Sequence, residues 1–255
     1  MKSYKEQRFF LNCDLASMQQ TQTDQQKQLP QPPVEKPFKS HENLTELPAV
    51  KDIITTENDL FEIINQRRSR RNYTGKAIDL NQLSFLLWCT QGVKKILERK
   101  NNNVTFRTVP SAGARHLFET YLAVLKVEGL KPGIYRYCAL EHKLEFLHSV
   151  NNLPKQTVGA CLGQEFVGDS SVVFFWSAIP YRCEWRYAYM AAKLILLDAG
   201  HVCQNLYLAS EALGLGTCGI AAYDQQKSNE LIKVDGEDEM IVYIASVGKR
   251  SKEEK

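Results

Sequence analysis

The longest periodic segment of the chain constrains its fold most. It runs from about residue 187 to residue 213 and is closed by Gly214 and Gly216. As one helix it would be roughly 40 Å long, because each residue adds about 1.5 Å. It is too apolar around its circumference for a surface helix, yet its polar residues exclude a membrane span. The segment therefore predicts a helix buried in the core or in a subunit interface.

Three polar residues of this segment, Asp198, His201 and Asn205, share one helix face because they are spaced i, i+3 and i+7. A hydrogen-bonded interface seam explains them without any chemistry. We therefore interpret His201 as a satisfied core or interface residue and not as a catalytic base.

Strands and shorter helices surround this segment. Strand-like runs cover residues 121–127 and 171–179 and the final run 240–247, and residues 134–137 and 144–147 form a plausible hairpin. Capping-box spacings predict helices over residues 56–66 and 79–92, and residues 94–103 read as a polar loop. Helices and strands alternate without a repeated βαβ unit, which predicts an α+β fold with helices around one sheet.

The composition of the chain argues against several classes of function. A chain of 255 residues with 44% hydrophobic content suits one large domain or two small ones. A net charge of +3 implies no general attraction to nucleic acid or to an anionic membrane. The seven scattered cysteines form no C-x-x-C pair, so they indicate reduced thiols of a cytoplasmic protein and neither a disulfide frame nor a metal site. We find no signal peptide and no segment apolar enough to cross a bilayer.

The first 51 residues differ from the rest. Residues 1–51 are polar, with glutamines between positions 19 and 31 and five prolines between positions 30 and 48. Such a stretch is a flexible or extended arm. A disordered tail and an arm that lies along a partner subunit both remain open from the sequence.

The most charged stretch of the chain comes directly after the helix predicted over residues 56–66. In residues 67–71, here called the arginine segment, Arg67, Arg68 and Arg71 surround Ser69. Guanidinium groups bind phosphate as planar forks, so these residues are candidates for a phosphate clamp. The clamp would act through side chains, since the negative end of a helix dipole repels anions. A solvated basic turn is the alternative.

Two other stretches could approach a flat ligand with their backbone. The first stretch consists of Pro110, Ser111, Ala112 and Gly113. The second is a glycine-marked loop over residues 214–220, which includes Cys218, Gly219 and Ile220. Small residues allow the backbone to come close to a ligand. Lys249 and Arg250 could add cations to a phosphate, or they could be a basic tail. The dinucleotide-binding, P-loop, nucleophile-elbow and zinc-protease motifs are absent.

Taken together, these stretches resemble the FMN-dependent nitroreductase family, and within it the SagB-type dehydrogenase branch. Six blocks occur in family order: RRSRRNY, LSFLLWCTQG, RTVPSAGARHLFETYLAV, PGIYRY, LDAGHVCQNLYLASEALGLGTCGIAAYD and EDEMIVYIASVGKR. The arm sequence DQQKQLPQPPVEKP also resembles the lead-in of stand-alone members. The resemblance covers most of the chain from about Leu60 to Arg250.

The resemblance implies a nitroreductase-like fold, with a mostly antiparallel sheet, a long dimer-interface helix and FMN between the subunits of a homodimer. Residues 52–255 would be the FMN-binding domain. Arg67, Ser69 and Arg71 would hold the phosphate and the pyrimidine side of the ring, with Arg68 contributing mainly backbone. Residues 110–113 would come from the other subunit, Cys218, Gly219 and Ile220 would lie beside the ring, and Lys249 and Arg250 would contact the phosphate.

One position departs from the azoline-oxidising members of the branch, which carry a Lys-Tyr pair at the start of the long helix. Here Tyr187 matches, but arginine stands at position 186 in place of the lysine. Arginine stays protonated and is a poor general base. The expected activity is therefore hydride transfer through the flavin between NAD(P)H and a quinone- or nitro-type acceptor, with Tyr187 as a proton donor or substrate contact.

Three other functions stay open from the sequence. The chain could be an azoline dehydrogenase acting on a thiazoline or oxazoline peptide, or a catalytically inactive flavin-binding module. A nucleic-acid binder using the arginine segment is disfavoured by the small net charge.

Overall fold

A computed structural model describes residues 8–12, 20–98 and 103–251. Its centre is a seven-stranded sheet in the order β1-β6-β5-β4-β7-β9-β8, with every neighbouring pair antiparallel. The strands are β1 (Leu44–Glu46), β4 (Phe118–Val124), β5 (Gly133–Cys138), β6 (Lys143–His148), β7 (Val172–Ala178), β8 (Leu215–Ile220) and β9 (Met240–Lys249). The α+β prediction with a mostly antiparallel sheet is confirmed.

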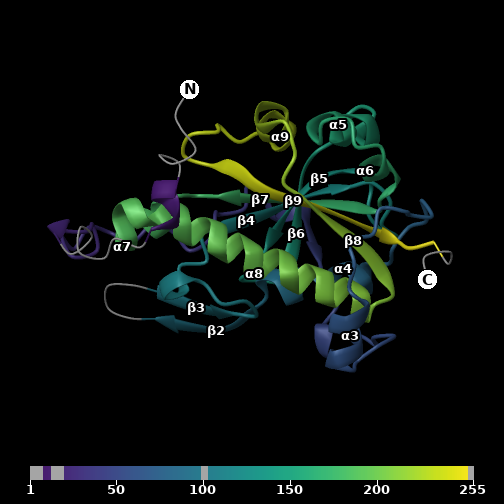
Figure 1. Cartoon of the computed structure of the whole chain (residues 1–255), viewed down its shortest axis with the longest axis horizontal. Coiled ribbons are helices and arrows are strands. Elements are labelled where there is room, and N and C mark those ends of the chain that lie inside the picture. The colour runs from purple at the N-terminus through teal and green to yellow at the C-terminus, as the bar shows by residue number, and fades with distance from the viewer. Residues whose placement is uncertain (1–7, 13–19, 99–102, 252–255) are drawn as a thin grey trace.

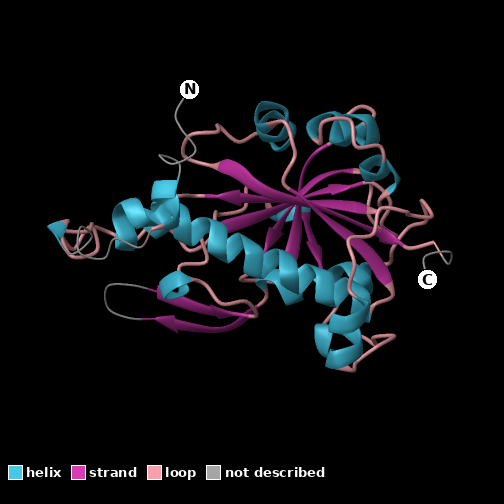
Figure 2. Ribbon diagram, in the orientation of Figure 1, coloured by secondary structure: helices cyan, strands magenta, loops and turns pink. Residues whose placement is uncertain are grey.

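Helices cover both faces of this sheet (Figures 1 and 2). One face carries α4 (Leu80–Gln91) and α8 (Ala191–Ala212); the other carries α5 (Leu153–Ala160), α6 (Phe166–Asp169) and α9 (Gln225–Ile232). The remaining helices are α3 (Leu60–Gln66), α7 (Tyr181–Tyr187) and the short turns η1 (Arg8–Leu11), η2 (His41–Asn43), η3 (Val50–Asp52), η4 (Ala112–Ala114) and η5 (Ala188–Met190).

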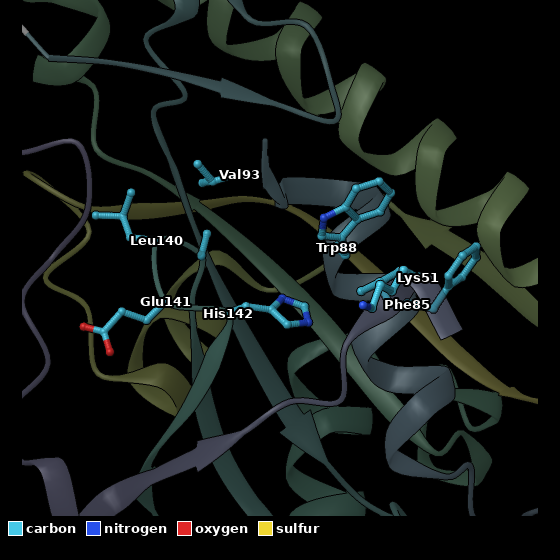
Figure 3. A pocket seen from close by; sticks show the side chains of 9 residues that line it. Lys51, Phe85, Trp88, Val93, Leu140, Glu141 and His142 are labelled. Atoms are coloured by element: carbon cyan, nitrogen blue, oxygen red, sulfur yellow. The ribbon is translucent and has the colours of Figure 1, made fainter. Parts of the chain in front are cut away.

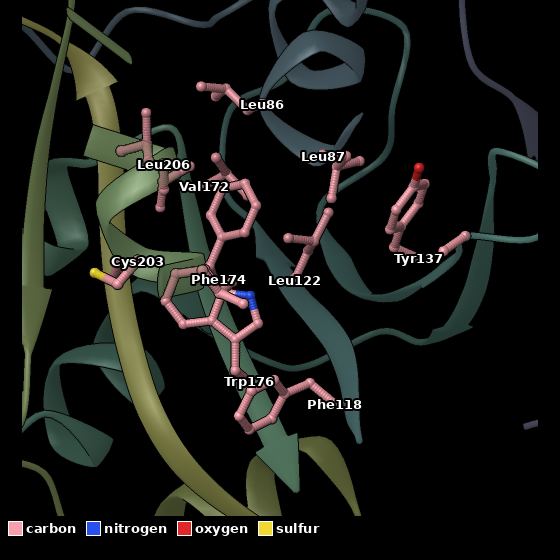
Figure 4. Packing of buried hydrophobic residues seen from close by; sticks show 14 of the residues in the cluster. Leu86, Leu87, Phe118, Leu122, Tyr137, Val172, Phe174, Trp176, Cys203 and Leu206 are labelled. Atoms are coloured by element: carbon pink, nitrogen blue, oxygen red, sulfur yellow. The ribbon is translucent and has the colours of Figure 1, made fainter. Parts of the chain in front are cut away.

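The central strand β7 shows how the sequence builds the two layers. Its side chains alternate between the faces, because successive residues of a strand point in opposite directions. Phe174 and Trp176 pack against α8 and α4, as Figure 4 shows, whereas Val173 and Phe175 pack under α5, α6 and α9. Every residue of β7 is buried. A continuous apolar run is therefore what a strand covered on both faces requires.

Two predicted helices have clear local signals. The helix after Asp79 is confirmed: Asp79 and Gln82 form a capping box and the helix ends at Gly92. The earlier helix begins at Leu60 and not at Thr56, because Asp59 is its N-cap. Thr56 instead donates its hydroxyl to the carbonyl of Ala212 at 2.9 Å, which fastens this segment to the end of α8.

Other predicted boundaries also need correction. Residues 94–98 are not loop but part of β2 (Val93–Glu98), which pairs with β3 (Asn103–Arg107) in a hairpin. Most of the glycine-marked stretch 214–220 is not loop but the edge strand β8, which begins at Leu215. The predicted long helix is confirmed as α8, but it starts at Ala191 and not at about residue 187, because Ala188, whose φ is +45°, separates it from α7. Residues 99–102 of the predicted loop lie outside the described part.

The described part of the N-terminal arm packs against the rest of the same chain, where its backbone contacts a group of buried ion pairs. Arg136 pairs with Glu119 and Glu145, and Glu119 also binds Arg182, all four being at most 2% exposed. We call these four residues the arm network. The Lys36 backbone N–H donates to Glu119 at 2.8 Å, and the Lys36 carbonyl accepts from Arg136 at 2.8 Å. Backbone groups of the arm thus satisfy charges that the fold buries.

Candidate functional site

The fold brings the arginine segment onto the edge of β8. Ser69 forms a parallel bridge with Thr217, and the Arg70 N–H donates to the Thr217 carbonyl at 2.9 Å. Tyr73 follows and packs over Gly216 and Gly248, where an added Cβ would lie 3.3 Å and 2.9 Å from its ring atoms. Two stretches predicted from distant parts of the sequence are therefore adjacent, and small residues permit the contact.

The arginines of this segment have two different roles. Arg70 is buried and pairs with Glu211 at 3.2 Å, so it belongs to the core. Arg250 binds the same carboxylate at 2.6 Å. Arg250, which the resemblance assigned to phosphate, therefore already has an anionic partner.

Arg67, Arg68 and Arg71 have no carboxylate partner among the described residues. The guanidinium of Arg67 lies 5.4 Å from the ring centroid of Tyr207, and that of Arg71 lies 5.8 Å from the ring of Phe166. Burial raises the pKa of the Cys218 thiol, and the adjacent charge of Arg71 opposes that shift. The β8 edge therefore carries cations that are held by aromatic rings and not neutralised.

Sequence reasoning missed Tyr207, which lies among the predicted residues. Its hydroxyl is 2.9 Å from the Ser69 hydroxyl and accepts a hydrogen bond from the Gly219 N–H at 2.7 Å. Gly219 must be glycine here, because a Cβ would lie 2.8 Å from the Tyr243 hydroxyl. No local pattern marks Tyr207 in the sequence, since it occupies one position of a long apolar helix. Only the approach of β8 to α8 shows its place.

The 110–113 stretch lies elsewhere, against the first half of α8. Ser111 donates its hydroxyl to Asp198 at 2.6 Å, and the Ala112 N–H donates to the same carboxylate at 3.2 Å. Burial raises the pKa of Asp198, while these hydrogen bonds oppose the shift. Asp198 thus anchors this loop within its own chain, and Asn205 of the predicted seam likewise donates to the Cys89 carbonyl at 2.9 Å.

Tyr187 and Arg186 lie over Gly113. Gly113 has a φ of +57°, and a Cβ there would lie 2.5 Å from the Tyr187 hydroxyl and 3.1 Å from Nε of Arg186. Glycine is therefore required both by the backbone conformation and by the contact. The predicted catalytic tyrosine is next to the 110–113 loop and not next to the arginine segment.

The predicted residues thus form two groups in one chain. One group lies near Tyr207 and the other near Asp198, which precedes it by nine residues in α8. At about 1.5 Å per residue, this corresponds to roughly 13 Å along the helix axis. Of the remaining predicted residues, Ile220 packs in the core beneath α5 and α9, and Pro110 is exposed. Lys249 is half-buried, and its carbonyl accepts from the N–H of Thr74, which follows the arginine segment by three residues.

The outer face of α8 carries large apolar side chains that the single chain leaves exposed. Leu196 is 63% exposed and Leu197 is 52% exposed; on α3, Phe61 is 72% exposed and Ile64 is 55% exposed. Adjacent exposed apolar side chains of this size are typical of interaction surfaces. Within the described residues, no His, Cys, Asp and Glu group could hold a metal ion, and no helix is long and apolar enough to cross a membrane.

Comparison with known proteins identifies the fold. The sequence model of the Nitroreductase family matches residues 64–249, well over half of the chain. The chain belongs to the nitroreductase family. The match begins inside α3 and ends with β9, so it includes both groups of predicted residues.

Named relatives agree with this membership. A protein of Methanocaldococcus jannaschii named as a nitroreductase is 30% identical over 194 residues, which are 74% of this chain and 89% of that protein. A trifolitoxin-processing protein of Rhizobium leguminosarum bv. trifolii is 28% identical over 113 residues, 43% of this chain and 30% of that protein.

A solved nitroreductase-family structure has the same architecture. The structure of a protein from Anabaena variabilis named as a nitroreductase has a TM-score of 0.63 at 28% identity, over 76% of this chain and 38% of that one. This chain therefore spans well under half of the Anabaena and rhizobial proteins. Its nitroreductase-like fold and membership make it an oxidoreductase of a family that binds flavin.

Proposed function

We propose that this nitroreductase-family chain is an FMN-dependent oxidoreductase that works as a homodimer. The observation that carries the proposal is the set of unneutralised cations at the β8 edge. Arg67 and Arg71 lack carboxylate partners in the described part of the chain and lie beside Ser69 and the backbone of Cys218 and Gly219. Cations and backbone amides beside a strand edge suit a ligand that has both a phosphate and a flat ring.

The residues present fit FMN in their chemistry. Arg67, Ser69 and Arg71 would hold the phosphate and the pyrimidine edge, and Lys249 would add a positive charge. Arg68 would contribute backbone, and Arg250 would act through Glu211, which it binds. Bound FMN supplies the hydride chemistry at its N5 atom. The chain's part is to orient the ring and to place positive charge at its pyrimidine edge.

A second copy of the chain would complete the site. The 110–113 loop is separated from the arginine segment along α8, so the loop of one subunit would cover the site of the other. The exposed face of α8 with Leu196 and Leu197 would supply the contact. Burying such a face is the main driving force for association.

Within this site, Tyr187 would donate a proton or contact the acceptor. Its hydroxyl lies over Gly113, and its ring is 5.6 Å from the Arg186 guanidinium. The acceptor would be a small quinone- or nitro-type molecule reduced with NAD(P)H. Turnover that stays unchanged in Tyr187→Phe, at equal flavin content, would contradict this role.

The alternative substrate is a thiazoline or oxazoline peptide, as in SagB-type dehydrogenases. The partial similarity to a trifolitoxin-processing protein favours it. Arg186 in place of lysine speaks against it, because arginine does not give up its proton. Flavin binding without turnover of any acceptor would favour an inactive module. A cytoplasmic location, in keeping with the six free cysteines of the described residues, belongs to the proposal.

The first test is the visible spectrum of the purified protein, followed by identification of the released chromophore. We expect yellow protein with FMN and a dimer by light scattering. Lys155→Ala, at an exposed position of α5, is the matched control for arginine variants and should bind flavin normally. Protein that stays colourless after incubation with FMN would refute the proposal.

A further inference from the structure

A cavity of about 570 Å³ lies away from both groups of predicted site residues. Four elements form it: the end of the arm at η3, helix α4, the start of β2 at Val93, and the turn between β5 and β6 (Figure 3). Its lining residues are Val50, Lys51, Phe85, Trp88, Val93, Ala139, Leu140, Glu141 and His142. Its volume lies in the range of small-molecule pockets, about 300–1,000 Å³.

Hydrogen bonds hold the walls of this cavity in place. Ser84 of α4 donates its hydroxyl to the carbonyl of Pro48 at 2.6 Å, which ties the arm to the helix. On the opposite wall, the Glu35 carboxylate accepts from the N–H groups of Ala139 and Leu140 at 2.6 Å and 3.2 Å. The cavity is therefore built by contacts between the arm and the domain.

His142 is fixed as a neutral, fully bonded wall residue. Since the Ser84 hydroxyl donates to Pro48, it accepts from Nε2–H of His142 at 2.8 Å. Nδ1 then accepts from the Tyr137 hydroxyl at 2.7 Å. Burial lowers the pKa of His142, which agrees with the neutral ring. The imidazole has no free donor or acceptor for a ligand.

The charged side chains at the rim differ in how they are paired. Glu141 pairs with Lys143 at 2.8 Å, and Lys143 also binds Glu46 at 3.0 Å. Lys51 is exposed at the rim and has no anionic partner within the part of the chain that the structure describes. An ammonium group beside apolar walls selects a ligand that carries one negative charge.

We propose that this cavity binds an apolar monocarboxylate, with its acid group at Lys51 and its hydrocarbon body on Trp88, Phe85 and Leu140. The apolar walls supply most of the binding free energy, because they remove hydrocarbon surface from water. Lys51 supplies the preference for the acid over a neutral molecule of the same shape. The site is independent of the proposed flavin site, since the two share no residue.

The test uses decanoate and decan-1-ol as a matched pair, titrated into the full-length protein saturated with FMN. Trp88 serves as the reporter, because Trp176 and Trp185 are at most 2% exposed and lie outside the cavity. We expect saturable tryptophan fluorescence changes and one decanoate per chain by calorimetry. Trp88→Phe should remove the fluorescence change, with binding still visible by calorimetry.

Two variants decide the assignment. Lys51→Gln should weaken decanoate about tenfold and leave decan-1-ol unchanged, because only the acid loses its charge partner. Leu140→Glu, at a position 37% exposed, places a like charge on the wall and should abolish decanoate binding while the protein stays folded.

Three results would overturn the proposal. The first is that decanoate does not saturate the protein at concentrations up to about 1 mM. The second is that the wild type and Lys51→Gln bind decanoate with equal affinity. The third is that Leu140→Glu binds decanoate as the wild type does. The last would place the ligand on another surface, such as the α8 face. Titration of flavin-free protein gives the same answer if the sites are separate, so failure of the FMN proposal would not affect the result.

Discussion

Arginine is used in opposite ways in the arm network and in the arginine segment. In the arm network, Arg136 and Arg182 are buried and each is bound to a carboxylate. In the arginine segment, Arg67 and Arg71 rest against aromatic rings without a carboxylate in the described residues. A buried arginine without its partners would be costly, whereas an exposed one loses little. Paired arginines therefore hold the fold, and unpaired ones are available to a ligand.

The largest effect should come from the arm network. Arg136→Met leaves Glu119 and Glu145 with one fewer cation and removes two bonds to the arm, at the carbonyls of Lys36 and Pro37. We expect a loss of about 3–5 kcal/mol in the free energy of unfolding. Denaturant titration measures it. Arg71→Met is the paired variant and should change this free energy by less than about 0.5 kcal/mol. If both variants lost the same free energy of unfolding, the distinction between buried, paired arginines and unpaired ones would be wrong.

A pH-dependent effect should come from Glu35, which carries the arm's bond to the β5–β6 turn. Burial, and after it the charge of Glu119, raises the pKa of Glu35 from 4.5 to about 7. The folded state therefore holds this proton more tightly than the unfolded state does. Its stabilising contribution is complete below pH 4.5 and is lost as the pH rises through 7.

The variant Glu35→Gln should lack this loss. Between pH 5 and pH 8, we expect wild-type stability to fall relative to Glu35→Gln by on the order of 2 kcal/mol. Thermal unfolding across this range measures the difference. Glu141→Gln changes an exposed carboxylate of the same turn and should keep the wild-type pH dependence. Parallel curves for wild type and Glu35→Gln would show that Glu35 does not titrate in this window.

In contrast to the arm network, a substitution in the arginine segment should change the affinity for FMN and leave the free energy of unfolding nearly unchanged. Arg71→Ala removes a charge-assisted contact to FMN, worth about 1.5–3 kcal/mol, so affinity should fall roughly 10- to 100-fold. Titration of flavin-free protein with FMN measures it, beside Lys155→Ala. An Arg71→Ala protein that binds FMN like the wild type would remove Arg71 from the proposed site.

The smallest effect should come from Tyr207, whose hydroxyl bonds both Ser69 and the Gly219 N–H. Tyr207→Phe frees these two groups for the cofactor. We expect FMN to bind a few-fold more tightly, since no protein hydrogen bond must then be exchanged. The same titration measures the change. Weaker binding would instead place the phenol in contact with the flavin.

Prediction from the sequence succeeded where the signal is local. The capping box of Asp79 and Gln82 lies within four residues, and the apolar run of β7 needs only its own composition. Prediction was wrong at β2 and β8, where polar or glycine-rich stretches are strands because a neighbouring strand supplies their hydrogen bonds. Strand pairing over long separations leaves little local pattern.

The sequence by itself determined the α+β class, the family and the cluster of cations at residues 67–71, because periodicity, ordered blocks and adjacent charges can be read along the chain. Only the tertiary structure decided which arginines are free. Arg70 is removed from the cluster by Glu211, 141 positions later, and Glu119 collects Arg136 and Arg182 from two other elements. Charge pairing depends on distances in space, and folding sets those distances through the packing of strands and helices that are far apart in sequence.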